Sequence, residues 1–148
     1  MTHSDLVRRM ARWLKLSKKM TVVISELQSC ALERPDVIGW IGAGQSILIE
    51  VKVSRSDFHK DKAKTIRQIN ALGMGNMRYF AAPKGILVPS DMPSGWGLLE
   101  VDANVRVLKE AKKKKSNKEA ECILLVRAIR RLELSTAVYV VRDSRKRL

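Results

Sequence analysis

Two β-prone segments joined by a glycine-rich turn constrain the fold of this chain more than any other feature. Residues 37–41 and 46–53 are mostly apolar and rich in β-branched side chains, and the sequence Gly42-Ala43-Gly44-Gln45 connects them. Apolar runs separated by a short turn with glycine are typical of a β-hairpin. The second run is apolar over most of its length, which favours a central position in a sheet. The sequence therefore predicts a hairpin whose second strand lies inside the sheet.

The rest of the chain alternates between strand-like and helix-like patterns. Further strands are expected at residues 20–25, 78–82, 96–101 and 105–108, and helices at residues 4–17, 56 to 71 and 119–132, with Ser4 and Ser56 as N-caps. Residues 137–141 are also β-prone. The sum predicts one α/β domain over residues 1–148, with a mixed central sheet flanked by helices, a basic loop at 112–118 and a basic tail at 142–148.

The charge of the chain favours a polyanionic partner. The sequence holds 29 Lys and Arg against 15 Asp and Glu, a net charge of +14. These basic residues are not confined to one amphipathic helix, so nucleic acid is favoured over an anionic membrane surface. No apolar run approaches the roughly 20 residues of a membrane span, and Arg8, Arg9 and Arg12 interrupt any signal-peptide pattern. We expect a cytoplasmic protein with Cys30 and Cys122 as free thiols.

Two acids and a lysine accompany the predicted hairpin. Asp36 comes directly before its first strand, while Glu50 and Lys52 lie two residues apart on its second strand and so project from the same face. Pairing across the hairpin can bring Asp36 beside them. Two carboxylates with a lysine suit a hard divalent cation such as Mg²⁺, and in so basic a chain the expected substrate is a phosphodiester. The alternative is a surface salt bridge between Glu50 and Lys52, with Asp36 as a turn residue.

The same residues resemble the motif of the PD-(D/E)XK nuclease superfamily. The match begins at Pro35-Asp36 and Glu50-Val51-Lys52 and continues through residues 52–58 and Asp61-Lys62, where it is similar to MmcB-like DNA repair proteins and their phage relatives. Residues 79–83 and 97–102 also fit strands of that family, so the resemblance covers residues 20 to 132. It implies a restriction-endonuclease-like core and metal-dependent DNA hydrolysis in repair, recombination or phage DNA metabolism, in a bacterial cell or a phage-infected host.

The resemblance also implies roles for individual residues. Asp36 and Glu50 would hold Mg²⁺, or Mn²⁺ in its place, with the backbone carbonyl of Val51 as a further ligand. Lys52 would orient or deprotonate the attacking water, or stabilise charge on the phosphate. Many members of the superfamily carry an additional acid and a glutamine at the site, for which Glu26 and Gln68 are the candidates.

DNA contacts are expected beyond the catalytic motif. The candidates near the site follow Lys52 into a helix N-terminus, where hydroxyls and basic side chains bind phosphate, and a second set forms a basic run: Ser54, Arg55, Ser56, Lys60, Lys62, Lys112, Lys113, Lys114 and Lys115. Helix capping and a solvated basic loop are the competing interpretations. Trp13, Trp40 and Trp96 are scattered, which favours core or rim positions over a base-stacking platform.

The sequence is therefore compatible with three functions. The first is a Mg²⁺-dependent endonuclease acting on duplex, nicked or branched DNA, for which a symmetric homodimer is the common way to cut both strands. The second is a non-catalytic DNA-binding protein on the same fold, and the third is a basic interaction module in a larger assembly. The combination of Asp36, Glu50 and Lys52 favours the enzyme, because binding alone does not require all three.

Overall fold

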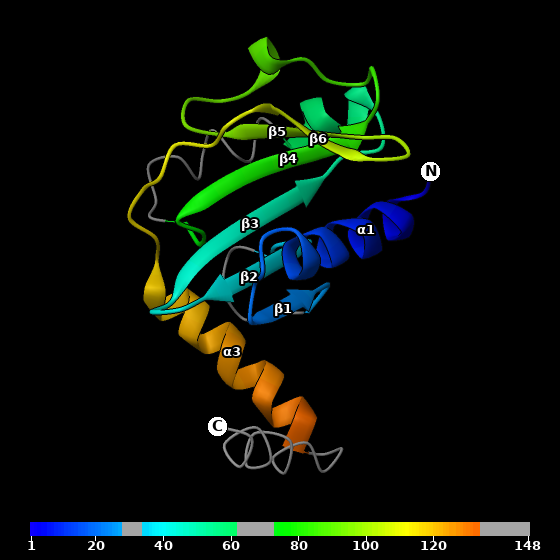
Figure 1. Ribbon diagram of the computed structural model, residues 1–148. Coiled ribbons are helices and arrows are strands. Elements are labelled where there is room, and N and C mark those ends of the chain that lie inside the picture. The colour runs from blue at the N-terminus through cyan, green and yellow to red at the C-terminus, as the bar shows by residue number, and fades with distance from the viewer. Residues whose placement is uncertain (28–33, 62–72, 134–148) are drawn as a thin grey trace.

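The structure, a computed structural model, describes residues 1–27, 34–61 and 73–133. Six strands form one sheet in chain order: β1 (Val22–Ser25), β2 (Val37–Ile41), β3 (Gln45–Val51), β4 (Met77–Pro83), β5 (Gly97–Val101) and β6 (Val105–Lys109). Strands β3, β4 and β5 run parallel, while β1, β2 and β6 are antiparallel to their neighbours. The predicted mixed sheet of an α/β domain is confirmed, with β3 in its interior (Figure 1).

The β2–β3 hairpin forms where the sequence predicts it. Val37 pairs with Ile49 and Ile41 with Gln45, so the turn occupies residues 42–44. Gly42 and Gly44 both have positive φ, at 56° and 84°, a region that favours glycine. This register decides which residues of the two strands face one another at the far end of the hairpin.

Helix α1 (His3–Leu16) covers one face of the sheet (Figure 1). Its buried stripe includes Leu6, Met10 and Leu14, which pack in one core with Val37 and Ile49. The N-cap lies two residues earlier than predicted: Thr2, not Ser4, caps the helix. Its side chain accepts a hydrogen bond from the backbone N–H of Asp5, whose carboxylate bonds back to Thr2. This capping box fixes the start of the helix, and it leaves Ser4 inside the first turn.

The other face is covered by the chain that follows β3 and by α3 (Lys118–Glu133). Phe58 and Leu124 are fully buried there, against the aromatic pair Phe80 and Trp96, whose rings stack with centroids 4.5 Å apart. Of the three tryptophans, Trp40 and Trp96 are buried and Trp13 is partly buried, as predicted for core and rim positions.

The helix after Lys52 begins at residue 55, and residues 55–61 are described as helical. Ser54, not Ser56, caps it, because the Ser54 hydroxyl accepts a 3.1 Å hydrogen bond from the backbone N–H of Asp57. The rest of the predicted helix to residue 71, the β-prone residues 137–141 and the basic tail at 142–148 lie outside the described residues. Within the described part of the chain, no helix combines the length and apolar character that crossing a membrane demands.

The predicted loop at 112–118 is an extended segment that is tied to the sheet. The backbone N–H of Lys112 donates to the carbonyl of Gly95, and that of Lys114 to the carbonyl of Asn76, at 2.9 and 2.8 Å. The Asn76 side chain returns a bond to the Lys114 carbonyl. Since Asn76 and Gly95 precede β4 and β5, the segment crosses the N-terminal ends of the parallel strands (Figure 1).

Candidate active site

Asp36 is held directly by the neighbouring strand. Its Oδ2 accepts a 2.8 Å hydrogen bond from the backbone N–H of Val51, and its side chain is 20% exposed. The last pair of the β2–β3 ladder is Val37 with Ile49, so the next residues along, Asp36 and Glu50, face one another. The sequence prediction that pairing brings these two acids together is therefore confirmed.

The carboxylates of Asp36 and Glu50 interact strongly. Glu50 is partly buried, and burial raises the pKa of its carboxyl group well above the usual 4.5. The negative charge of Asp36 and a hydrogen bond to it raise this pKa further, while the positive charge of Lys52 acts in the opposite direction. The ionised form of Glu50 is therefore disfavoured beside Asp36.

Lys52 lies just beyond β3, where its backbone N–H donates to the carbonyl of Ala81 at 2.9 Å. Its side chain is 5% exposed and forms an ion pair with Asp61 of the following helix. Burial alone would lower the pKa of Lys52, but the hydrogen bond to Asp61 and the charges of Glu50, Asp61 and Asp36 raise it overall. The side chain is therefore an ammonium group at neutral pH, which makes it a charge and hydrogen-bond donor rather than a base.

Glu26 lies beside Asp36 on the other side. The backbone N–H of Glu26 donates to the carbonyl of Asp36 at 3.0 Å. The imidazole of His3, from the first turn of α1, stands between the two side chains, with Nε2 3.3 Å from Asp36 Oδ1 and Nδ1 3.7 Å from Glu26 Oε1. Glu26, Asp36 and Glu50 thus follow one another across the end of the sheet, and the imidazole of His3 lies between the first two.

Two residues of this site, Asp61 and His3, were not predicted. Asp61 belongs to the segment that carries the family resemblance, and its spacing of one helix turn past Phe58 could have suggested an inward position. No pattern in the sequence connects His3 to Asp36, because the contact depends on how α1 lies against the sheet. Gln68 and Lys62, which were predicted, lie outside the described residues.

A divalent cation at this site would need several oxygen ligands. In residues 1–27, 34–61 and 73–133, no group of three or more His, Cys, Asp and Glu side chains is arranged to hold a metal ion. Asp36 and Glu50 nevertheless offer oxygen ligands at one point, and their mutual repulsion is the situation that a bound cation relieves. The two carboxylates therefore fit a hard cation. Val51 contributes its N–H to Asp36; its carbonyl as a ligand stays a prediction.

The predicted DNA contacts near the site have partners within the protein or face solvent. Arg55 forms a bidentate ion pair with Asp91, in which its two terminal nitrogens lie 3.1 and 3.0 Å from the carboxylate oxygens. It also donates a hydrogen bond to the carbonyl of Ile86. The Ser54 and Ser56 hydroxyls lie 3.0 Å apart, and Lys60 is exposed. Arg55 therefore fastens the start of this helix to the loop around Asp91, a structural role that the sequence did not suggest.

The basic run Lys112–Lys115 is exposed but far from the candidate site. It contacts Asn76, at the N-terminal end of β4, whereas Glu50 pairs with Phe80, four residues further along the same strand. At the usual rise of a strand, these levels are separated by about 13 Å. The run and the carboxylates thus belong to opposite ends of the sheet.

Comparisons with known proteins identify one solved structure of similar fold. Over 86% of both chains, the SPO1766 protein of Silicibacter pomeroyi, described as a protein of unknown function, aligns with a TM-score of 0.66 and 28% sequence identity. No model of a known protein family matches the chain, and a search of curated proteins gave no match. The fold therefore occurs in a protein of Silicibacter pomeroyi, whose description gives no activity.

Proposed function

We propose that this protein is a metal-dependent DNA nuclease of the PD-(D/E)XK type. The observation that carries the proposal is the close pair of carboxylates, Asp36 and Glu50, with the ammonium group of Lys52 on the same strand end. Two carboxylates whose close approach raises the pKa of one of them are suited to a divalent cation. The sequence resemblance to MmcB-like proteins supports the same assignment.

Each side chain has a distinct task in this proposal. Asp36 and Glu50 would hold Mg²⁺ or Mn²⁺, and the bound cation would stabilise negative charge on the phosphate and lower the pKa of a water molecule. Lys52 would donate to the phosphate or orient the water, because its raised pKa keeps it protonated. Asp61 would hold the Lys52 ammonium in place through their ion pair. His3, which lies between Glu26 and Asp36, would fix the orientation of the Asp36 carboxylate.

DNA is the proposed substrate class because of charge. A net charge of +14 on 148 residues favours a polyanion, and the site chemistry suits a phosphodiester. The test is to incubate the protein with labelled duplex, nicked, single-stranded and branched DNA in Mg²⁺ or in EDTA. We expect cleavage that EDTA abolishes on at least one substrate. Binding of every substrate without cleavage in Mg²⁺ or Mn²⁺ would favour a non-catalytic DNA-binding protein.

A further inference from the structure

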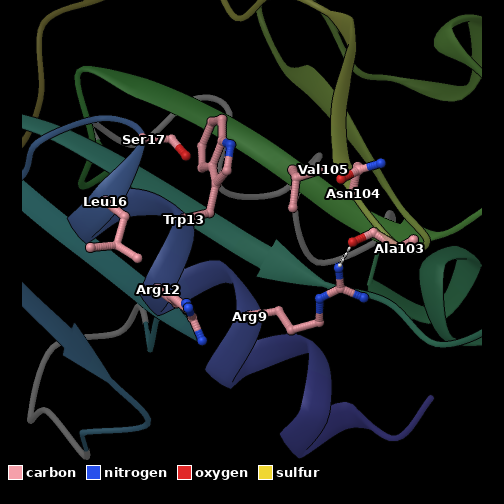
Figure 2. A pocket seen from close by; sticks show the side chains of 8 residues that line it. All are labelled: Arg9, Arg12, Trp13, Leu16, Ser17, Ala103, Asn104 and Val105. Atoms are coloured by element: carbon pink, nitrogen blue, oxygen red, sulfur yellow. Dashed lines mark hydrogen bonds between the residues drawn. The ribbon is translucent and has the colours of Figure 1, made fainter.

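A groove separates α1 from the turn between β5 and β6 (Figure 2). It has a volume of about 550 Å³, and its walls include Arg9, Arg12 and Trp13 from the helix, and Asn104 and Val105 from the turn. Arg9 reaches across one end and donates from its two terminal nitrogens to the carbonyls of Asp102 and Ala103. This bridge fixes the helix to the turn, so the groove is built into the fold.

The groove carries positive charge that the protein leaves unneutralised. Arg12 is exposed on its wall, and within the described residues it forms no ion pair; Lys15 and Lys19 are exposed on the same helix and the turn that follows. Of the acids near the turn, Asp102 pairs with Arg106, and Glu110 accepts a hydrogen bond from the hydroxyl of Tyr79. A polyanion in the groove would therefore meet the positive charges of Arg12 and Lys18.

Trp13 gives the groove an apolar wall. Its indole is partly exposed, is braced edge-on by Tyr79 with ring centroids 6.5 Å apart, and has the Lys18 ammonium 5.1 Å from its ring centroid. In Figure 2 the ring stands between Ser17 and Val105. A fixed aromatic side chain beside arginine suits a ligand that has both phosphates and flat or apolar parts, as a nucleic-acid strand does.

The groove lies on the face of the sheet that α1 covers, whereas Glu50 and Lys52 project from the opposite face, because Ile49 and Val51, which alternate with them, pack against α1. Strands β3, β4 and β5 are parallel, so Lys52 after β3 and Asp102 after β5 both follow carboxyl ends (Figure 1). Two strand spacings separate β3 from β5, a distance on the order of 10 Å. His3, at the start of the same helix, already contacts Asp36.

We infer that the groove between α1 and the β5–β6 turn binds a DNA strand, with Arg12 on its phosphates and Trp13 against its sugars or bases. The inference rests on the proposed function for its substrate class. It adds a second contact surface for DNA, on the face of the sheet opposite to the one from which Glu50 and Lys52 project.

The test is DNA binding in EDTA, where no metal-dependent cleavage occurs. Fluorescence anisotropy with labelled single-stranded and duplex 20-mers would compare Arg12→Glu with Arg131→Glu, a matched reversal of an exposed arginine at the far end of α3. We expect Arg12→Glu to weaken binding about tenfold or more and to reduce the salt dependence by about one phosphate contact, while Arg131→Glu changes affinity less than about twofold.

Equal effects of the two reversals would overturn the inference, because they would reflect net charge alone. Competition with dAMP and with vesicles of anionic phospholipid separates the other ligands. Displacement of the strand by dAMP at equal nucleotide concentration would indicate a mononucleotide site, and vesicle binding that depends on Arg12 without any effect on DNA would indicate a membrane surface. Either outcome would contradict a strand-binding groove. Failure of the nuclease proposal would appear separately, as absent cleavage in Mg²⁺ despite groove-dependent binding.

Discussion

The carboxylate of Asp36 accepts a hydrogen bond from the backbone N–H of Val51, the residue that follows Glu50 on the neighbouring strand. The backbone of β3 thus fixes the acid that precedes β2, and it does so next to the second acid. Two like charges are brought together by the same hairpin that builds the sheet. This proximity, together with burial, disfavours the ionised form of Glu50 and raises the pKa of its carboxyl group.

Glu50→Gln should stabilise the metal-free protein at neutral pH. A carboxyl group whose folded pKa is raised contributes its full stability below its unfolded pKa, near 4.5, and loses it as the pH rises through the folded pKa. Glutamine cannot ionise, and its amide can donate to Asp36 as the protonated acid does. We expect a gain of about 1 kcal/mol in the free energy of unfolding at pH 7, measured by urea titration in EDTA, and a smaller gain at pH 4.

The control for this variant is Glu119→Gln, which removes an exposed acid from the first turn of α3. Added Mg²⁺ should raise the melting temperature of the wild-type protein and of Glu119→Gln, but not that of Glu50→Gln, because ligand binding stabilises only the protein that binds. A Glu50→Gln variant that loses stability at pH 7 in EDTA would mean that the ionised carboxylate is favourable where it lies.

Lys52→Met should abolish cleavage while leaving DNA affinity within about twofold of wild type. Methionine keeps much of the buried volume of Lys52 and removes only the charge that pairs with Asp61. Single-turnover cleavage and anisotropy would be measured side by side, with circular dichroism to confirm folding. Asp61→Asn should lower the cleavage rate less severely than Lys52→Met, because it removes the ion pair that holds the Lys52 ammonium group but leaves that group in place. A cleavage rate equal to that of wild type would show that the ion pair does not position Lys52.

The sequence predicted the hairpin and the three motif residues because both depend on local periodicity. Alternation within β3 places Glu50 and Lys52 on one face, and a short turn fixes the register that brings Asp36 opposite. The contacts of Lys52 with Asp61 and of His3 with Asp36 depend on helix placement, which no spacing rule supplies. The caps at Thr2 and Ser54 were missed by two residues each, because several hydroxyl residues compete at both helix starts.

Replacing Lys112 to Lys115 with glutamine should weaken DNA binding without changing the chemical step. The run is exposed and lies at the N-terminal ends of β4 and β5, away from the carboxylates. Each lost phosphate contact should reduce the slope of log affinity against log salt by about 0.9, with little dependence on DNA sequence. Anisotropy across a salt series tests this, and an unchanged slope would identify the run as a solvated loop. A slower single-turnover rate at saturating protein would place it at the active site instead.

Glu121→Gln should destabilise the protein by about 2 kcal/mol in urea titration. The Glu121 carboxylate is 2% exposed and accepts from Trp40, Ser46, Gly75 and Lys118. Burial alone would raise its pKa, but these hydrogen bonds lower it. Its contribution is therefore present above pH 4.5 and is lost as the pH falls through the folded pKa. Equal stability of Glu121→Gln and Glu119→Gln at pH 7 would show that this buried network does not hold α3 to the sheet.

The most direct test of the central claim is the rate of DNA cleavage in Mg²⁺ for wild type, Asp36→Asn and the control Glu119→Gln. Asparagine keeps an oxygen that can accept from Val51, so the fold is retained while one metal-binding charge is removed. A nuclease centre built on Asp36 and Glu50 predicts cleavage by wild type and Glu119→Gln that EDTA abolishes, and a loss of about a hundredfold or more in Asp36→Asn at fixed Mg²⁺. Equal rates for all three proteins, or cleavage that persists in EDTA, would contradict it.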